Sequence, residues 1–480
     1  KSGDITTIKV NSSGVIEWTL RIPSPEFTVN SGTAITIDSN GFLYLVGYLW
    51  NQTSMDVFCA KISNEGQLIW QIIYGNSSNF EIPNSLVLSN SGELYVSGIT
   101  HSNSKVTYYI SKVSSLGQLL WEHVDTTFPS QTWNEPKILR LDNLGNLLVC
   151  GYGYEDNEEG SASKTVTIKF NSAGVQLWKK YKSTQITIDN NLYFVDSWPT
   201  DFTLDTNNSI YVVKNYNDEF FTKSATIKYD HAGEELWLIN QYFDDESSTL
   251  LKSILFHENK LFVGGYKNGN PDEGDGFVLH SLNLDGSSNW SQHSSDQYVP
   301  SDFFMSLISS TICLNSRFMD SDTFESVINS STYSIANGSL QSSNEFYLNQ
   351  ASNGITVGAF LGVTFNSNSK SFILNSTYST HGTVYEVLQF DAANSLIWNT
   401  KYVSQNSIRV NVLETVADSS SNTFSLISSF YVNEQDAEQI SQKSYIIKYN
   451  SIGQFVSSYM ISDTVGTSSL RLFVTNNNEL

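Results

Sequence analysis

The feature that most constrains this chain is a short pattern that recurs along almost its whole length. An apolar segment ends in Asn, Asp or Ser, a glycine follows three residues later, and a tryptophan comes four residues after the glycine. The glycines are Gly14, Gly66, Gly117, Gly174, Gly233 and Gly286, and the tryptophans are Trp18, Trp70, Trp121, Trp178, Trp237, Trp290 and Trp398. The first six tryptophans are spaced by 51 to 59 residues, so one structural unit repeats along the chain.

The glycine position indicates a hairpin turn. Before Trp398 the glycine is replaced by Asn394, and Gly and Asn are the residues that best tolerate a positive φ. A left-handed residue between two strands is typical of a tight hairpin. A large aromatic side chain at a fixed place in each unit predicts packing between neighbouring units.

A second hairpin alternates with the first, for example in residues 34–47, 86–98 and 138–151. Alternating apolar residues and many β-branched and aromatic side chains indicate strands throughout, with no helical stretch. Four short strands per unit make up a propeller blade. We therefore predict an all-β fold: one β-propeller domain over residues 1–480, with about eight to nine four-stranded blades, a degenerate region at 306–380, and a place in a longer polypeptide.

A lysine stands two residues before most of the turn residues. With this lysine, the pattern resembles the bacterial-type beta-propeller repeat family, and the resemblance covers most of the chain. The lysines are Lys9, Lys61, Lys112, Lys169, Lys228 and Lys448, while Ser281 and Gln389 depart from the pattern. The resemblance implies a propeller fold in a secreted or cell-surface protein.

The Gly-x-x-x-Trp element is also similar to the tryptophan-docking motif of quinoprotein propellers. The chain departs from that family, because Cys59, Cys150 and Cys313 are far apart and no calcium site for a quinone can be placed. The resemblance therefore implies docking between blades and no quinone. Cys59 and Cys150 fall inside apolar strand patterns and are expected to be small buried hydrophobes.

Charge excludes several partners. The net charge of −22 argues against nucleic acid and against anionic lipid surfaces. No run of about 18 apolar residues occurs, so no membrane span is expected. Only 15% of the residues are charged, and a surface rich in Ser, Asn and Thr favours an extracellular or cell-surface location.

The loops between hairpins are expected to gather on one face, and loops carry function more often than strands do. Acidic residues recur there, and carboxylate oxygens are the ligands that calcium prefers. The candidate ligands are Glu155, Asp156, Asp218, Glu219, Asp272 and Asp275. The alternative is a solvated acidic rim, and no other cofactor is expected.

Trp50, Trp133 and Trp198 lie in these loops, outside the repeat positions. Exposed aromatic rings can stack on sugars or anchor a protein partner. The alternative is burial of the three rings beneath the loops.

No pair of carboxylates, Ser–His–Asp set or metal-ligand spacing is recognisable in the sequence. We therefore predict a protein without enzymatic activity: a structural or adhesive propeller that binds a protein partner or assembles with itself, for example in an extracellular filament. The alternative prediction is a carbohydrate-binding or glycan-active propeller that uses the long-loop face.

Overall fold

The computed structural model describes the chain from residue 4 to residue 462. Not described within that range are 12–14, 24–28, 103–104, 130–131, 155–161, 242–246, 269–274, 295–298, 309, 320–325, 348–358, 366–368, 380–381, 392–395, 406–408, 419 and 434–435. The described residues form strands, turns and loops, and none of them lies in a helix that could span a membrane. Two compact units are present: unit 1 comprises Lys1–Ile5 and Ile22–Gln297, and unit 2 comprises Thr6–Arg21 and Tyr298–Leu480.

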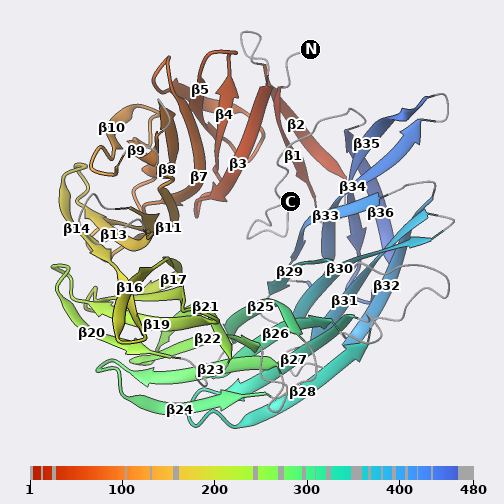
Figure 1. Ribbon diagram of the computed structural model, residues 1–480. Helices are drawn as coiled ribbons and strands as arrows, with labels where there is room; N and C mark the ends of the chain where they lie inside the picture. Colours follow the sequence, from red (N-terminus) through yellow and green to blue (C-terminus); the bar gives the residue numbers. More distant parts are fainter. Residues whose placement is uncertain are drawn as a thin grey trace. The chain divides into compact units, whose positions relative to one another are not determined.

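Unit 1 is a series of four-stranded antiparallel sheets whose strands follow chain order (Figure 1). The first eight strands are β3 (Val29–Ile37), β4 (Leu43–Trp50), β5 (Met55–Ile62), β6 (Leu68–Tyr74), β7 (Phe80–Leu88), β8 (Leu94–Ser102), β9 (Lys105–Val113) and β10 (Leu119–Val124). The next sheets comprise β11 (Glu135–Leu141), β12 (Leu147–Gly153), β13 (Lys164–Phe170), β14 (Gln176–Lys182), β17 (Ser197–Leu204), β18 (Ile210–Asn217), β19 (Thr222–Tyr229), β20 (Glu235–Asn240), β21 (Ser248–His257), β22 (Lys260–Asn268), β23 (Gly276–Asn283) and β24 (Ser288–His293). A single parallel pair, Met55 with Phe80, joins the β3–β6 and β7–β10 groups.

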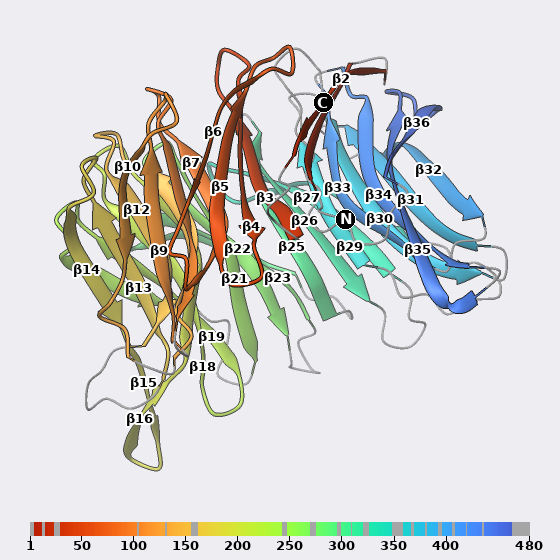
Figure 2. The same ribbon diagram turned by 90° about the horizontal axis from the view of Figure 1, so that it is seen from above.

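One hairpin in unit 1 does not belong to any of these sheets. It consists of β15 (Thr184–Ile188) and β16 (Asn191–Val195), which pair only with each other. The hairpin is inserted between β14 and β17, and Figure 2 shows it projecting beyond the neighbouring strands.

The described part of unit 2 contains three more four-stranded sheets and an N-terminal hairpin. Their strands are β25 (Val299–Ile308), β26 (Thr311–Met319), β27 (Ser326–Ser334), β28 (Leu340–Tyr347), β29 (Ala359–Phe365), β30 (Ser369–Ser379), β31 (Gly382–Asp391), β32 (Leu396–Gln405), β33 (Arg409–Ala417), β34 (Thr423–Asn433), β35 (Asp436–Tyr449) and β36 (Phe455–Ser462), with β1 (Ile5–Val10) and β2 (Ile16–Ile22) in the hairpin. Val10 of the hairpin packs with Phe424, Leu426 and Ile446.

This architecture confirms the predicted fold class, an all-β propeller of four-stranded antiparallel blades. The number of blades stays a prediction. The region predicted to be degenerate, 306–380, covers most of the β25–β28 sheet and the first two strands of the β29–β32 sheet.

The apolar core lies between neighbouring sheets rather than within one. Tyr95 and Tyr108 of the β7–β10 sheet form one buried cluster with Leu147 and Val166 of the β11–β14 sheet. The next cluster joins residues of the β11–β14 and β17–β20 sheets in the same way. Cys59, Cys150 and Cys313 are buried, and none of them forms a disulfide; for Cys59 and Cys150 this burial is as expected for small hydrophobes.

The repeated tryptophan joins each sheet to the next. Trp121 donates its indole N–H to the carbonyl of Ser172, at 3.3 Å, in the turn after β13. The indole ring covers Gly174 so closely that a Cβ there would lie 2.6 Å from it. The same contact joins Trp70 to Gly117, Trp178 to Gly233, Trp237 to Gly286 and, in unit 2, Trp398 to Gly453. For these five tryptophans, the prediction that the ring packs between successive repeats is confirmed.

The repeated lysine shares the tryptophan's acceptor. Lys112 lies directly across the ladder from Trp121, and its ammonium donates to the same Ser172 carbonyl at 3.0 Å. Lys169 and Lys228 make the corresponding bonds to His231 and Leu284. Where Gln389 replaces the lysine, its amide oxygen accepts the Trp398 indole N–H directly, at 2.5 Å.

A bulge in the first strand of each sheet explains a second set of glycines. The register shifts after Pro136 in β11 and after Pro83 in β7, for example. Across from these bulges, a Cβ at Gly151 or Gly98 would lie 2.2 or 2.1 Å from a backbone carbonyl oxygen. At Gly98 and Gly151 the opposing backbone therefore leaves no room for a side chain.

The docking contact predicts an unequal response of two turn glycines. Both Gly174 (φ +83°) and Gly145 (φ +76°) have left-handed backbones, but a Cβ at Gly145 would meet no atom within 4 Å. Gly145→Ala should cost about 1 kcal/mol in free energy of unfolding, and Gly174→Ala about 2–4 kcal/mol because it also collides with Trp121. Urea denaturation of the two variants measures this difference, and equal losses would refute the docking role.

Candidate functional site

The loops that leave the second and fourth strands of each sheet lie at the same edge of unit 1, because antiparallel strands alternate in direction. We call the described residues 51–54, 75–79, 125–129, 132–134 and 218–221 the long-loop edge. The edge carries the candidate site.

Trp133 is the outstanding residue of this edge. Its side chain is 53% exposed, whereas the other nine tryptophans, all of them described, are buried or half-buried. The exposed ring is nevertheless fixed, because its indole N–H donates to Glu135 Oε2 at 3.2 Å. A partly exposed aromatic ring is therefore restrained by a hydrogen bond to a neighbouring carboxylate.

The Glu135 carboxylate is itself held by two further donors. Lys137 Nζ lies 2.7 Å from Oε1, and the Tyr152 hydroxyl donates to Oε2 at 3.2 Å. Burial by itself would raise the pKa of Glu135, but the hydrogen bonds from Lys137, Trp133 and Tyr152 outweigh it and lower the pKa. The Glu135 carboxylate is therefore ionised at neutral pH. Burial and the neighbouring Glu135 charge raise the pKa of Tyr152 to about 12, so the Tyr152 phenol keeps its proton and remains a donor.

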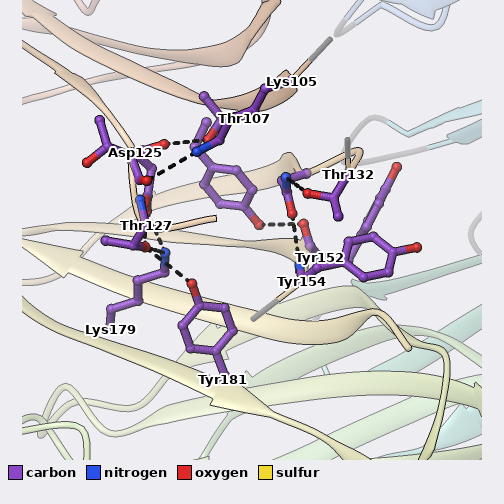
Figure 3. Close-up of polar contacts among 12 residues, drawn as sticks. Lys105, Thr107, Asp125, Thr127, Thr132, Tyr152, Tyr154, Lys179 and Tyr181 are labelled. Carbon is purple, nitrogen blue, oxygen red and sulfur yellow. Dashed lines mark hydrogen bonds and ion pairs between the residues drawn. The ribbon is translucent and has the colours of Figure 1, made fainter. Parts of the chain in front are cut away.

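The residue after Trp133, Asn134, ties this loop to its surroundings, and two of its partners, Thr132 and Tyr154, are labelled in Figure 3. Asn134 is fully buried, and its amide donates to the Val106 carbonyl at 2.8 Å and to the Thr132 hydroxyl at 2.9 Å. Its side-chain oxygen accepts the Tyr154 backbone N–H at 2.8 Å. The loop that carries Trp133 is thus anchored by a buried amide whose donor and acceptor groups all have hydrogen-bond partners.

A buried ion pair lies on the same connection. Lys179 of β14 reaches back to Asp125, which follows β10, with Nζ 2.6 Å from Oδ2. The two side chains are 7% and 1% exposed. Thr127 donates to Asp125 and accepts from Lys179, as Figure 3 shows.

Electrostatics keep this pair charged. Burial alone would raise the pKa of Asp125, but the Lys179 ammonium and the hydrogen bonds from Lys179 and Thr127 outweigh burial, so that the pKa is lowered. The Lys179 ammonium also lies 3.7 Å from the centre of the Phe128 ring and 4.7 Å from that of Tyr181. The pair holds the loop that carries Trp133 onto the β11–β14 sheet.

Two carboxylates that the sequence did not single out converge near Gly75. A Cβ on this glycine would lie 2.9 Å from Glu81 Oε2 and 3.0 Å from Asp56 Oδ1. Burial raises the pKa of both groups, and the Asp56 charge raises that of Glu81 further. Both carboxylates therefore hold a proton more readily than ordinary exposed carboxylates do.

The other two tryptophans predicted as interaction residues are placed differently. Trp50 ends β4 and Trp198 lies in β17, and both side chains are half-buried. For these two, burial is the better description. No signal in the local sequence separates them from Trp133.

The structure does not bring the predicted acidic ligands together. Glu155, Asp156 and Asp272 lie outside the described residues. Asp218 accepts the backbone N–H groups of Phe220 and Phe221, so it caps its own turn, and Glu219 is exposed beside it. Asp275 lies at the start of β23. No cluster of three metal-binding side chains occurs among the described residues, and calcium binding stays a prediction.

Comparison with known proteins gives a fold and no family. The chain matches no family model and no curated protein, so its resemblance to the bacterial-type repeat family stays a prediction. Among solved structures it is similar to prolyl endopeptidases (TM-score 0.41, 8% identity, 88% of this chain and 54% of theirs). It is also similar to a polysaccharide lyase, with a TM-score of 0.41 and 10% identity over 75% of this chain and 89% of the lyase. A third similar structure is a lignostilbene dioxygenase from Pseudomonas brassicacearum, with a TM-score of 0.38 and 10% identity over 80% of this chain and 94% of the dioxygenase. The chain spans about half the length of the prolyl endopeptidases.

These solved structures correct two predictions. The proteins are peptidases, a lyase and a dioxygenase, which contradicts the prediction of a non-catalytic structural propeller and the prediction that the chain is not an enzyme. Both predictions are withdrawn. At 8–10% identity the likeness concerns the fold and assigns no reaction to this chain.

The ion pair predicts a specific pH and mutation response. Because the folded pKa of Asp125 is lowered, the stability that it contributes is present above about pH 4 and is lost as the pH falls through the folded value. Lys179→Met should cost about 3–5 kcal/mol at pH 7, because it leaves a buried charge unpaired. Urea unfolding from pH 2 to 7 measures both effects.

The control is the double variant Asp125→Asn/Lys179→Met. It removes both charges and should recover most of the stability lost in the single variant. A double variant as unstable as Lys179→Met would show that the charges are not coupled.

Proposed function

We propose that this chain binds neutral oligosaccharides on the long-loop edge of unit 1, with Trp133 as the ring on which a sugar stacks. One observation carries the proposal. The Trp133 side chain is 53% exposed, and its indole N–H is hydrogen-bonded to Glu135. An exposed aromatic ring that is already immobilised pays little conformational entropy when a ligand covers it.

The groups around the ring suit hydroxyl-rich ligands. The ionised Glu135 carboxylate offers about four acceptor sites and receives three donors, so it can accept a further hydroxyl. The Lys137 ammonium uses one of its three N–H groups on Glu135, and its side chain is 43% exposed. An apolar face beside charged donors and acceptors is the combination that recognises a sugar ring and its hydroxyl groups.

Charge favours neutral glycans over acidic ones. The chain carries a net charge of −22, which repels polyanions at low ionic strength. A binding site for carbohydrate is also compatible with the predicted extracellular or cell-surface location.

Removal of the Trp133 ring should weaken glycan binding. Trp133→Ala should weaken the binding of neutral oligosaccharides at least about tenfold, because it deletes the stacking surface, and Glu135→Gln should weaken it less. Calorimetric titration with gluco-, manno-, galacto- and xylo-oligosaccharides measures the affinities. Tryptophan fluorescence should also change on binding in the native protein and not in Trp133→Ala.

Leu144→Ala is the matched control, because Leu144 is 76% exposed but lies in a turn at the opposite edge. It should leave affinity unchanged. Native protein that binds none of these glycans, or Trp133→Ala that binds them normally, would refute the proposal.

A further inference from the structure

Lys214 occupies a position that is glycine in four other sheets of unit 1. Gly47, Gly98, Gly151 and Gly265 lie opposite the bulge of the first strand, where a Cβ would be within 2.2 Å of a carbonyl oxygen. In the β17–β20 sheet the residue opposite Pro199 is Lys214. The repeat is broken there by a long cationic side chain.

The Lys214 amine is buried among neutral acceptors. The residue is 1% exposed, and Nζ lies 2.5 Å from Thr184 Oγ1 and 3.5 Å from the Ser183 carbonyl oxygen. By contrast, the buried Lys112 and Lys169 each have a carboxylate partner at 2.9 Å. Among the described residues, no carboxylate forms an ion pair with Lys214, and the Tyr216 ring, whose centre lies 5.8 Å from Nζ, adds only a weak contact.

The surrounding charges favour the neutral amine. Burial, followed by the nearby Lys182 ammonium, lowers the pKa of Lys214 to about 7. Glu235 acts in the opposite direction, but its carboxylate is bound by Lys182 at 2.7 and 2.8 Å. A neutral lysine amine is a nucleophile toward carbonyl carbon.

The base of the inserted hairpin, which we call the cover, contacts this amine. Ser183 and Thr184, the two acceptors of Lys214, begin the β15–β16 hairpin, which shares no ladder with the adjoining sheets. Leu192 at its tip is 67% exposed. An isolated two-stranded hairpin is only marginally stable, so it can open locally without loss of the fold.

We propose that Lys214 is a carbonyl-reactive site that condenses with small aldehydes when the β15–β16 hairpin moves aside. The amine nitrogen bonds to the aldehyde carbon, the carbonyl oxygen leaves as water with the two amine protons, and an imine forms without any change of oxidation state. This site is separate from the proposed glycan-binding site at Trp133 and does not depend on it.

Competitive labelling of the native protein tests this. Acetaldehyde at low concentration forms the imine, and cyanoborohydride reduces it to a stable N-ethyl amine. Peptide mass spectrometry then locates the ethylated lysine. At pH 7 only roughly one in 3,000 amines of an ordinary lysine is neutral. Even with hairpin opening as a prior step, Lys214 should be ethylated at least about tenfold faster than the exposed Lys137.

The pH profile and two variants separate reactivity from a structural role. The labelling rate of Lys214 should level off above about pH 7, well below the pH at which an ordinary lysine amine becomes mostly neutral. Thr184→Val should raise the Lys214 rate roughly threefold by removing one hydrogen bond of the cover, and Lys214→Met should lose the ethylated peptide. Slower labelling of Lys214 than of Lys137, or an unchanged rate in Thr184→Val, would overturn the proposal.

Discussion

The contact between the tryptophan of one sheet and the turn glycine of the next is the constraint on which the rest of this structure depends. Each sheet alone has two apolar faces and too few strands to bury them, so stability comes from the layers between sheets. The Trp121 ring fixes the distance and angle of that approach, because it lies on Gly174 and donates to Ser172. The lysine opposite the tryptophan donates to the same carbonyl, so the third and fourth strands of a sheet are both bound to one point of the neighbouring turn.

Most of this framework could be predicted from the sequence, since it is encoded locally and repeatedly. Glycines with positive φ, tryptophans at fixed spacing and alternating apolar residues each report a backbone requirement within a few positions. The observed φ of Gly66, Gly117 and Gly174 lies between 78° and 83°, as the turns require. The lysine appeared in the pattern too, but its acceptor belongs to another sheet and no spacing within one unit identifies it.

The candidate sites were harder to predict, for physical reasons that differ between residues. Trp50, Trp133 and Trp198 look alike in sequence, because exposure of a loop side chain depends on what packs over it. Asp125 and Lys179 come from different sheets, and only the docking of those sheets brings them together. Lys214 did leave a signal, since alignment of the repeats places it at a glycine position. A residue that violates the pattern of its own repeat is a better guide to chemistry here than one that follows it.

The docking contact is directional. A sheet offers its glycine and turn carbonyl to the sheet before it, and its tryptophan and lysine to the sheet after it, so the β7–β10, β11–β14 and β17–β20 sheets each carry both halves of a head-to-tail joint. Such contacts are heterologous, because the two surfaces that meet are different. A duplicated four-stranded sheet would therefore fit between two such sheets without the need for new complementary surfaces. Gene duplication could therefore lengthen or shorten this chain by whole units, while an insertion such as β15–β16 adds chemistry to a single unit and leaves the joints intact.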